Sequence, residues 1–176
     1  MSTDMEPAGK GSALWLMPEE PMFSLLADEI SRLSQRFLTP FFEPHITLVG
    51  GITAAEKEAV AESALLARLI KPFRIELGEV GYCEEYFRCL FINVIPGDLL
   101  IKAYRTAQES FDLQDKPAYL PHLSLLYGNL PVATKGELAA AYSFLSGQAF
   151  EVRCLALYRV SGRPQEWKCM GKYELR

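Results

Sequence analysis

The chain contains two histidines, and both lie in the same short pattern of residues. His45 lies in the segment PHITL and His122 in the segment PHLSL, so each histidine follows a proline and precedes an aliphatic residue, a hydroxyl residue and a leucine. With eleven prolines in 176 residues, the chance that both histidines follow a proline is about 1 in 250. One such segment is a weak signal, but a pair that uses every histidine of the chain indicates a functional site.

Each segment is typical of a β-strand, and a strand places residues two apart on the same face. His45 is therefore expected to project with Thr47, and His122 with Ser124. The aliphatic residue and the leucine of each segment point to the opposite face and can anchor the strand in a core. If the two strands meet, two imidazoles and two hydroxyls line one groove.

This set of groups suits the opening of a strained cyclic phosphodiester without a metal. A histidine has an ordinary pKa of about 6.5, so one of the pair can be neutral and the other protonated near neutral pH. The neutral ring takes a proton from water, and the protonated ring gives a proton to the leaving oxygen. The hydroxyls hold the non-bridging phosphate oxygens, where charge gathers in the transition state. The pattern leaves open which histidine is the acid and which is the base.

Other common site patterns are missing from the sequence. It has no GxSxG, no glycine-rich P-loop and no GxGxxG, so the motifs of serine hydrolases, P-loop NTPases and dinucleotide-binding proteins are absent. The cysteines form no CxxC pair, and two histidines leave little for a zinc site, so we expect no metal and no cofactor. We expect free thiols at Cys83, Cys89, Cys154 and Cys169. A disulfide between Cys154 and Cys169 stays open as an alternative.

The composition predicts one globular domain in the cytoplasm, and we expect it to be a monomer. Hydrophobic residues make up 49% of the chain and charged residues 23%. The net charge of −4 argues against a long nucleic-acid track, which needs a basic stripe. No apolar run is long enough to span a membrane, and the first residues do not resemble a signal peptide. We expect a flexible N-terminal tail over 1–11 and a single domain over 12–176.

The hydropathy pattern predicts secondary structure in a repeating order. The expected strands are 12–17, 45–50, 73–82, 87–95, 122–127, 149–160 and 166–175. The expected helices are 20–38, 53–70, 97–111 and 133–146. From residue 87 the order strand, helix, histidine strand, helix, strand repeats, with one strand added. We interpret the chain as two similar lobes related by a pseudo-two-fold axis.

Three element boundaries depend on particular residues. Gly50-Gly51 is expected to end the first histidine strand. Thr53 and Glu56 have the spacing of a capping box at the start of the next helix. Gly147 is expected to cap the C-terminus of the last helix.

The two histidine segments resemble the paired HxT/S motifs of the two-histidine (2H) phosphoesterases. The segments SALWLMP (12–18), FEPHITLVG (42–50) and YLPHLSLLYG (119–128) are most similar to the plant and yeast cyclic phosphodiesterases. The order of elements agrees from residue 12 to about residue 175.

The resemblance implies a bilobal α+β fold with pseudo-two-fold symmetry, in which each lobe is an antiparallel sheet with helices on its outer face and the site lies between the lobes. It implies metal-independent hydrolysis of ADP-ribose 1″,2″-cyclic phosphate, a by-product of tRNA splicing, to ADP-ribose 1″-phosphate. It also implies opening of nucleoside 2′,3′-cyclic phosphates to 2′-phosphates. The expected partner is therefore a small-molecule cyclic phosphate.

Site residues carry over by position. The resemblance makes His45 and His122 the catalytic acid–base pair, and it makes Thr47 and Ser124 the groups that hold the phosphate.

Further aromatic positions match the family pattern. Tyr127 matches a tyrosine that donates to the phosphate, while Trp15 and Phe87 lie where the family places aromatic rings near the base. Trp167 is expected in the core.

Two alternatives of the same fold stay open. One is an RNA-end enzyme, either 2′,5′ ligase-like or a 3′ exonuclease, which the acidic balance disfavours. The other is a nucleotide-binding module without catalysis, which the two intact motifs disfavour.

Overall fold

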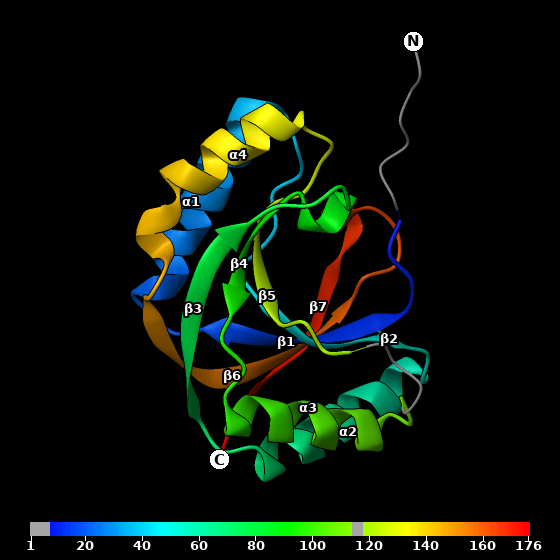
Figure 1. Cartoon of the computed structure of the whole chain (residues 1–176). Helices are drawn as coiled ribbons and strands as arrows, with labels where there is room; N and C mark the ends of the chain where they lie inside the picture. The colour runs from blue at the N-terminus through cyan, green and yellow to red at the C-terminus, as the bar shows by residue number, and fades with distance from the viewer. Residues whose placement is uncertain (1–7, 114–117) are drawn as a thin grey trace.

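The computed structural model describes residues 8–113 and 118–176, and its elements follow the predicted order (Figure 1). The strands are β1 (Ser12–Pro18), β2 (Ile46–Ile52), β3 (Phe73–Gly81), β4 (Leu90–Val94), β5 (His122–Leu126), β6 (Ala149–Arg159) and β7 (Lys168–Glu174). The helices are α1 (Met22–Phe37), α2 (Glu56–Leu69), α3 (Asp98–Ser110) and α4 (Val132–Ala141), with 3₁₀ turns η1 (Tyr86–Arg88), η2 (Ser143–Leu145) and η3 (Pro164–Glu166).

The strands form an antiparallel sheet in the order β1-β2-β5-β4-β3-β6-β7. Strand β6 also pairs with β1, so the first six strands of this order close a ring, and β7 adds to it along β6. Strands β2 and β5 meet at one residue pair in the described chain, Ile46 opposite Leu123. The two histidine strands are therefore neighbours that touch at one point and then separate.

The pairings have the expected pseudo-two-fold symmetry, and the predicted bilobal α+β fold is confirmed. The pair β1–β2 corresponds to β4–β5, and the pair β3–β4 corresponds to β6–β1. The helices follow the same rule, since α1 packs on β5 and α3 packs on β2. Figure 1 shows α1 and α4 on one side of the strands, with α2 and α3 on the opposite side.

The core explains why these elements hold their places. In α1 the buried residues Leu26, Ile30 and Leu33 recur at helical spacing, as the periodicity predicts. In the histidine strands, Ile46 and Leu123 are fully buried. Burial of these aliphatic side chains, worth about 2 kcal/mol each, fixes which face of each strand is turned away from the core.

Two predicted boundaries near β2 are wrong. The strand continues through Gly50-Gly51 to Ile52, because Gly51 adopts a positive φ of 72° that glycine tolerates without ending the pairing with β1. Helix α2 begins at Glu56, its N-cap residue is Ala55, and no side chain caps it. Thr53 lies too far before the first turn to form the expected capping box.

The last helix is shorter than predicted. Helix α4 ends at Ala141, and the 3₁₀ turn η2 continues the chain. Gly147, with a φ of 79°, follows η2 and donates its N–H to the carbonyl oxygen of Leu77 at 2.8 Å. The C-cap residues are Tyr142 for α4 and Ser146 for η2, so the expected Gly147 cap is wrong.

The start of the domain lies close to β6. Residues 1–7 of the expected tail lie outside the described residues, and Gly9 forms an antiparallel bridge with Gly162. All four cysteines are free, because strand register places Cys154 opposite Glu174 and Cys169 opposite Tyr158. In the described part of the chain, no helix has both the length and the apolar composition to cross a membrane.

Candidate active site

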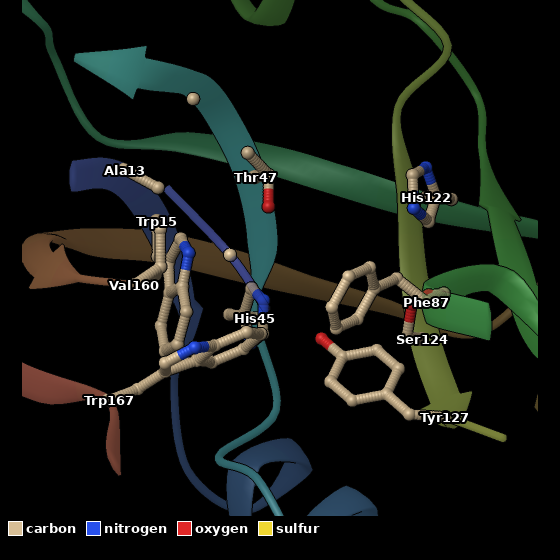
Figure 2. A pocket seen from close by; sticks show the side chains of 12 residues that line it. Ala13, Trp15, His45, Thr47, Phe87, His122, Ser124, Tyr127, Val160 and Trp167 are labelled. Atoms are coloured by element: carbon tan, nitrogen blue, oxygen red, sulfur yellow. Dashed lines mark hydrogen bonds between the residues drawn. The ribbon is translucent and has the colours of Figure 1, made fainter. Parts of the chain in front are cut away.

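A cavity of about 230 Å³ lies between the two lobes and contains every site residue predicted from the sequence. Figure 2 shows it from close by. The lining residues are Gly9, Ala13, Trp15, His45, Thr47, Gly50, Phe87, His122, Ser124, Tyr127, Val160 and Trp167. Residues from the N-terminal and C-terminal halves of the chain therefore meet in one place.

The strand register brings the two histidines to this cavity. The core side chains of Ile46 and Leu123 are directly paired, so the residues before and after them point the opposite way. His45 lies immediately before β2 and Thr47 lies on it, and His122 projects from β5 on the other side of the cleft (Figure 2). The predicted arrangement of one histidine and one hydroxyl per strand is present.

A backbone carbonyl two residues upstream orients each imidazole. The Nδ1 atom of His45 lies 2.6 Å from the carbonyl oxygen of Glu43, and that of His122 lies 2.9 Å from the carbonyl oxygen of Leu120. A carbonyl accepts but does not donate, so Nδ1–H is the donor in both rings. In the neutral ring Nε2 then carries the lone pair that faces a ligand. Sequence reasoning named no group that orients either ring and missed this backbone device.

The His45 ring is held in a stack of aromatic side chains. Trp15 stacks on it with ring centroids 3.6 Å apart, and Tyr158 stacks on the other face of Trp15 at 3.8 Å. The hydroxyl of Tyr158 donates to the carboxylate of Glu43, and the ammonium of Lys172 lies 3.6 Å from the same carboxylate. Since the Glu43 carbonyl holds Nδ1, the contacts form a closed loop around the imidazole.

Burial sets the protonation state of His45. Its side chain is 6% exposed, and burial lowers its pKa to about 4. The hydrogen bond to Glu43 partly opposes this shift, whereas the nearby His122 adds to it. His45 is therefore neutral at pH 7 in the unliganded protein.

His122 lies in a different setting. Phe91 contacts it edge-on with centroids 5.6 Å apart, and the ring is only partly buried. Burial lowers its pKa, while the hydrogen bond to the Leu120 carbonyl raises it. Arg88 lowers the pKa further and Glu85 raises it, and these two side chains form hydrogen bonds of 2.6 and 3.0 Å with each other.

Three hydroxyls surround the space between the histidines. The hydroxyls of Thr47 and Tyr127 point into the cleft in Figure 2. Burial raises the pKa of Tyr127, so it remains a protonated donor. The Ser124 hydroxyl donates to the carbonyl oxygen of Phe87 at 2.9 Å, so it must turn to donate to a ligand.

The aromatic rings that are free to contact a base differ from those predicted. Trp15 lines the cavity, but its two faces are covered by His45 and Tyr158, so a base cannot stack on it. Trp167, expected in the core, is partly buried against it and also lines the cavity, with its ring centroid 5.8 Å from that of Phe87. Its polar neighbours in the segment RPQEWK were the available signal that it follows a turn. Phe87 and Trp167 are the aromatic pair left for a flat ligand.

Among the residues that the structure describes, no group of three or more His, Cys, Asp or Glu side chains lies together as metal ligands do.

Sequence comparisons relate the chain to known proteins. The family described as "Cyclic phosphodiesterase-like protein" matches residues 10–175. A cyclic phosphodiesterase of Arabidopsis thaliana is 28% identical, with 82% of each chain covered. A 2′,3′-cyclic-nucleotide 3′-phosphodiesterase of Yarrowia lipolytica is 27% identical, covering 92% of this chain and 98% of that protein.

Solved structures share the fold. The Thermus thermophilus protein TT0787 has a TM-score of 0.66 at 21% identity, covering 94% of this chain and 98% of its own. Escherichia coli LigT complexed with 3′-AMP has a TM-score of 0.61 at 14% identity, covering 95% and 98%. At these identities the likeness concerns the fold alone.

Proposed function

The chain belongs to the cyclic phosphodiesterase-like family of 2H phosphoesterases, and on that premise we propose that it is a cyclic phosphodiesterase that opens ribose cyclic phosphates by hydrolysis without a metal. The proposed substrates are nucleoside 2′,3′-cyclic phosphates, opened to 2′-phosphates, and ADP-ribose 1″,2″-cyclic phosphate, opened to the 1″-phosphate. Both histidines come from one chain, so we also propose that the monomer is the working unit.

One observation carries the proposal: two imidazoles with the same Nδ1 anchor enter one cavity from opposite lobes. With Nδ1–H fixed to a carbonyl, each ring presents Nε2 to a phosphorus atom placed between them. A neutral Nε2 takes a proton from the attacking water, and a protonated Nε2 gives a proton to the leaving oxygen. The water oxygen bonds to phosphorus as the bond to the leaving ribose oxygen breaks.

The hydroxyls supply electrostatic support during this step. Thr47 and Tyr127 donate to the non-bridging oxygens, whose negative charge grows as water attacks. Ser124 can join them by turning its hydrogen away from the Phe87 carbonyl. Phe87 and Trp167 provide flat apolar surface for the base.

The charge of the cavity explains why the histidines must be the proton carriers. Among the described lining residues, none is lysine or arginine. A bound phosphate therefore finds its positive partner on an imidazole, and its negative charge raises the pKa of both rings. Substrate binding thus favours uptake of one proton by a pair that is otherwise largely neutral at pH 7.

The identity of the leaving oxygen decides which ribose oxygen keeps the phosphate when the cyclic phosphate is opened. The Yarrowia relative is named a 3′-phosphodiesterase, which denotes cleavage of the bond to the 3′ oxygen and leaves the phosphate on the 2′ oxygen. We propose the same outcome here.

The test is incubation of adenosine 2′,3′-cyclic phosphate with the protein in excess EDTA, followed by phosphorus NMR of the product. We expect adenosine 2′-phosphate at an undiminished rate. A rate abolished by EDTA and restored by a divalent metal would contradict the metal-free mechanism. Tight binding of the product with no turnover of either cyclic phosphate would instead indicate a nucleotide-binding module.

A further inference from the structure

A second cavity of about 220 Å³ adjoins the first beside Thr47 and His122. It shares Thr47, Gly50 and His122 with the cavity described above. We call it the second chamber, and its lining residues are Thr47, Leu48, Val49, Gly50, Tyr104, Leu113, Ala118, Tyr119, Leu120 and His122.

The sheet topology explains why the second chamber exists. Strands β2 and β5 are antiparallel and pair at Ile46 and Leu123 in the described chain, and beyond this pair they separate. Residues 47–50 follow along one strand, residues 118–122 lie along the other segment, and both runs line the chamber. The gap is therefore a product of the same divergence that opens the active site.

Internal contacts brace the chamber in the unliganded protein. The hydroxyl of Tyr119 donates to the carbonyl oxygen of Thr47 at 3.1 Å and ties the two separating segments together. Tyr104 of α3 stacks on the Tyr119 ring with centroids 4.0 Å apart and planes 5° from parallel. This stack forms a preorganised aromatic wall in the chamber that the catalytic His122 also lines.

The lining selects an uncharged, flat group. Among the described lining residues, the ionisable side chains are His122 and the two tyrosines, and burial raises the pKa of Tyr119, which keeps it neutral. Leu120 at the chamber is 66% exposed, and exposed large apolar residues beside a cleft are typical of binding surfaces. A nucleobase fits this chemistry, whereas a phosphate group has no cation here to pair with.

We propose, on the basis of the proposed function, that the second chamber binds a second nucleoside, linked through phosphate to the 5′ oxygen of the ribose that carries the cyclic phosphate. The reacting ribose then lies at the junction of the two cavities, beside Thr47 and His122. Its own base, where it has one, occupies the first cavity against Phe87 and Trp167. The anionic linker faces solvent at the cleft opening.

Two kinds of substrate carry such a nucleoside, and kinetics can separate them. One is a dinucleotide, adenylyl-(3′→5′)-adenosine ending in a 2′,3′-cyclic phosphate; the other is ADP-ribose 1″,2″-cyclic phosphate, with a diphosphate linker. Each is compared with adenosine 2′,3′-cyclic phosphate by the ratio of kcat/KM values. The expected ratio in the wild type is about ten, the worth of one base–aromatic stacking contact.

Two variants alter the chamber in different ways. Ala118→Trp fills it from an exposed position, and Tyr104→Leu removes one of the two stacked rings of the aromatic wall while keeping apolar bulk. In both we expect the ratio to fall to about one, since the stacking contact is lost. Ala61→Trp is the matched control, because Ala61 is an exposed alanine on α2 that lines neither cavity, and it should keep the wild-type ratio.

The proposal is supported if the wild type prefers either extended substrate and both chamber variants lose that preference. The substrate that the wild type prefers then identifies the linker that the protein accepts. A wild-type ratio of about one for both substrates, or a ratio that both chamber variants leave unchanged, overturns it. If the wild type opens none of the three compounds, the proposed function fails first, and the mononucleoside reaction reports this separately.

Discussion

The half-site on β2 and the half-site on β5 share a register but differ in what surrounds the imidazole. Trp15 of β1 lies opposite Thr47, and Phe91 of β4 lies opposite Ser124. Each aromatic ring contacts the histidine of its own half-site. Trp15 lies flat on His45 at 3.6 Å, whereas Phe91 meets His122 edge-on at 5.6 Å.

The difference teaches that a duplicated backbone frame can hold two chemically unlike groups. The frame fixes Nδ1 in both rings, while packing decides how much each ring is buried. His45 is the more buried ring, and its pKa falls to about 4, so a single proton is expected on His122. We therefore propose that His122 is the acid and His45 the base in the singly protonated pair, whose titration is coupled.

Removing either imidazole should have the largest effect. His45→Ala and His122→Ala should each lower kcat by about 10²–10⁴-fold, the range for one acid–base group. Turnover of adenosine 2′,3′-cyclic phosphate measures this, with the circular dichroism spectrum of each variant as the control for folding. Near-normal turnover by one variant would break the paired assignment.

The roles of His45 and His122 should be distinguishable in the pH dependence of activity. A base must be unprotonated, so activity that depends on His45 falls as pH decreases; an acid must be protonated, so activity that depends on His122 falls as pH increases. Residual activity of His45→Gln should therefore lose the acidic limb, and that of His122→Gln the alkaline limb. Exchanged limbs would reverse the acid and base assignment.

Folding stability should depend on acid through His45. The unfolded imidazole has a pKa of 6.5 and the folded one about 4, so between these values the unfolded chain binds more protons. Stability is complete above pH 6.5 and falls as pH decreases to 4, by about 3 kcal/mol. Urea unfolding of wild type and His45→Gln measures this, and the variant should show a weaker dependence, since the lowered pKa of His122 leaves part of it in place. An equal dependence in both would place the titration elsewhere.

Loss of the Thr47 hydroxyl should lower activity more than loss of the Ser124 hydroxyl. Thr47→Ala removes a hydroxyl already aimed at the cleft, so we expect about a tenfold loss of kcat/KM. Ser124→Ala should cost less, because Ser124 gives up its bond to the Phe87 carbonyl before it can help. Steady-state kinetics on both variants decides the order, and a larger loss for Ser124→Ala would reject this reasoning.

The smallest effect is expected at Tyr158, which positions His45 without touching the ligand. Tyr158→Phe keeps the stack on Trp15 but removes the hydrogen bond to Glu43, so we expect a loss of kcat of about threefold with KM unchanged. Tyr142→Phe is the matched control, since it removes a tyrosine–Glu29 bond of 3.0 Å outside the cavity lining. Equal kinetics for both variants would remove Tyr158 from the account.

Sequence reasoning predicted what depends on residue type and local period. The paired segments identified both histidines and their hydroxyls, because strand alternation alone decides that they share a face. The repeat of elements gave the two lobes for the same reason. Boundaries that depend on one cap or one glycine, as at Thr53 and Gly51, were wrong because tertiary pairing overrides such local signals.

What sequence reasoning missed comes from contacts between distant segments. The carbonyl anchors of the imidazoles carry no residue signature, since every residue has a carbonyl. The stack of Trp15 between His45 and Tyr158 joins three segments that are distant in the sequence, so no local pattern reveals that it is closed to a base. The position of Trp167 at the cavity likewise depends on how β7 lies along β6.

The most direct measurement of the central claim is a pH titration of the two imidazole signals by NMR, which the presence of just two histidines makes simple to assign with His45→Gln. In the free protein we expect one signal to titrate near pH 4 and the other with a pKa lowered from its ordinary value. With adenosine 2′-phosphate bound, both pKa values should increase, because both rings face one phosphate. A ligand that shifts one signal and leaves the other unchanged would contradict the account.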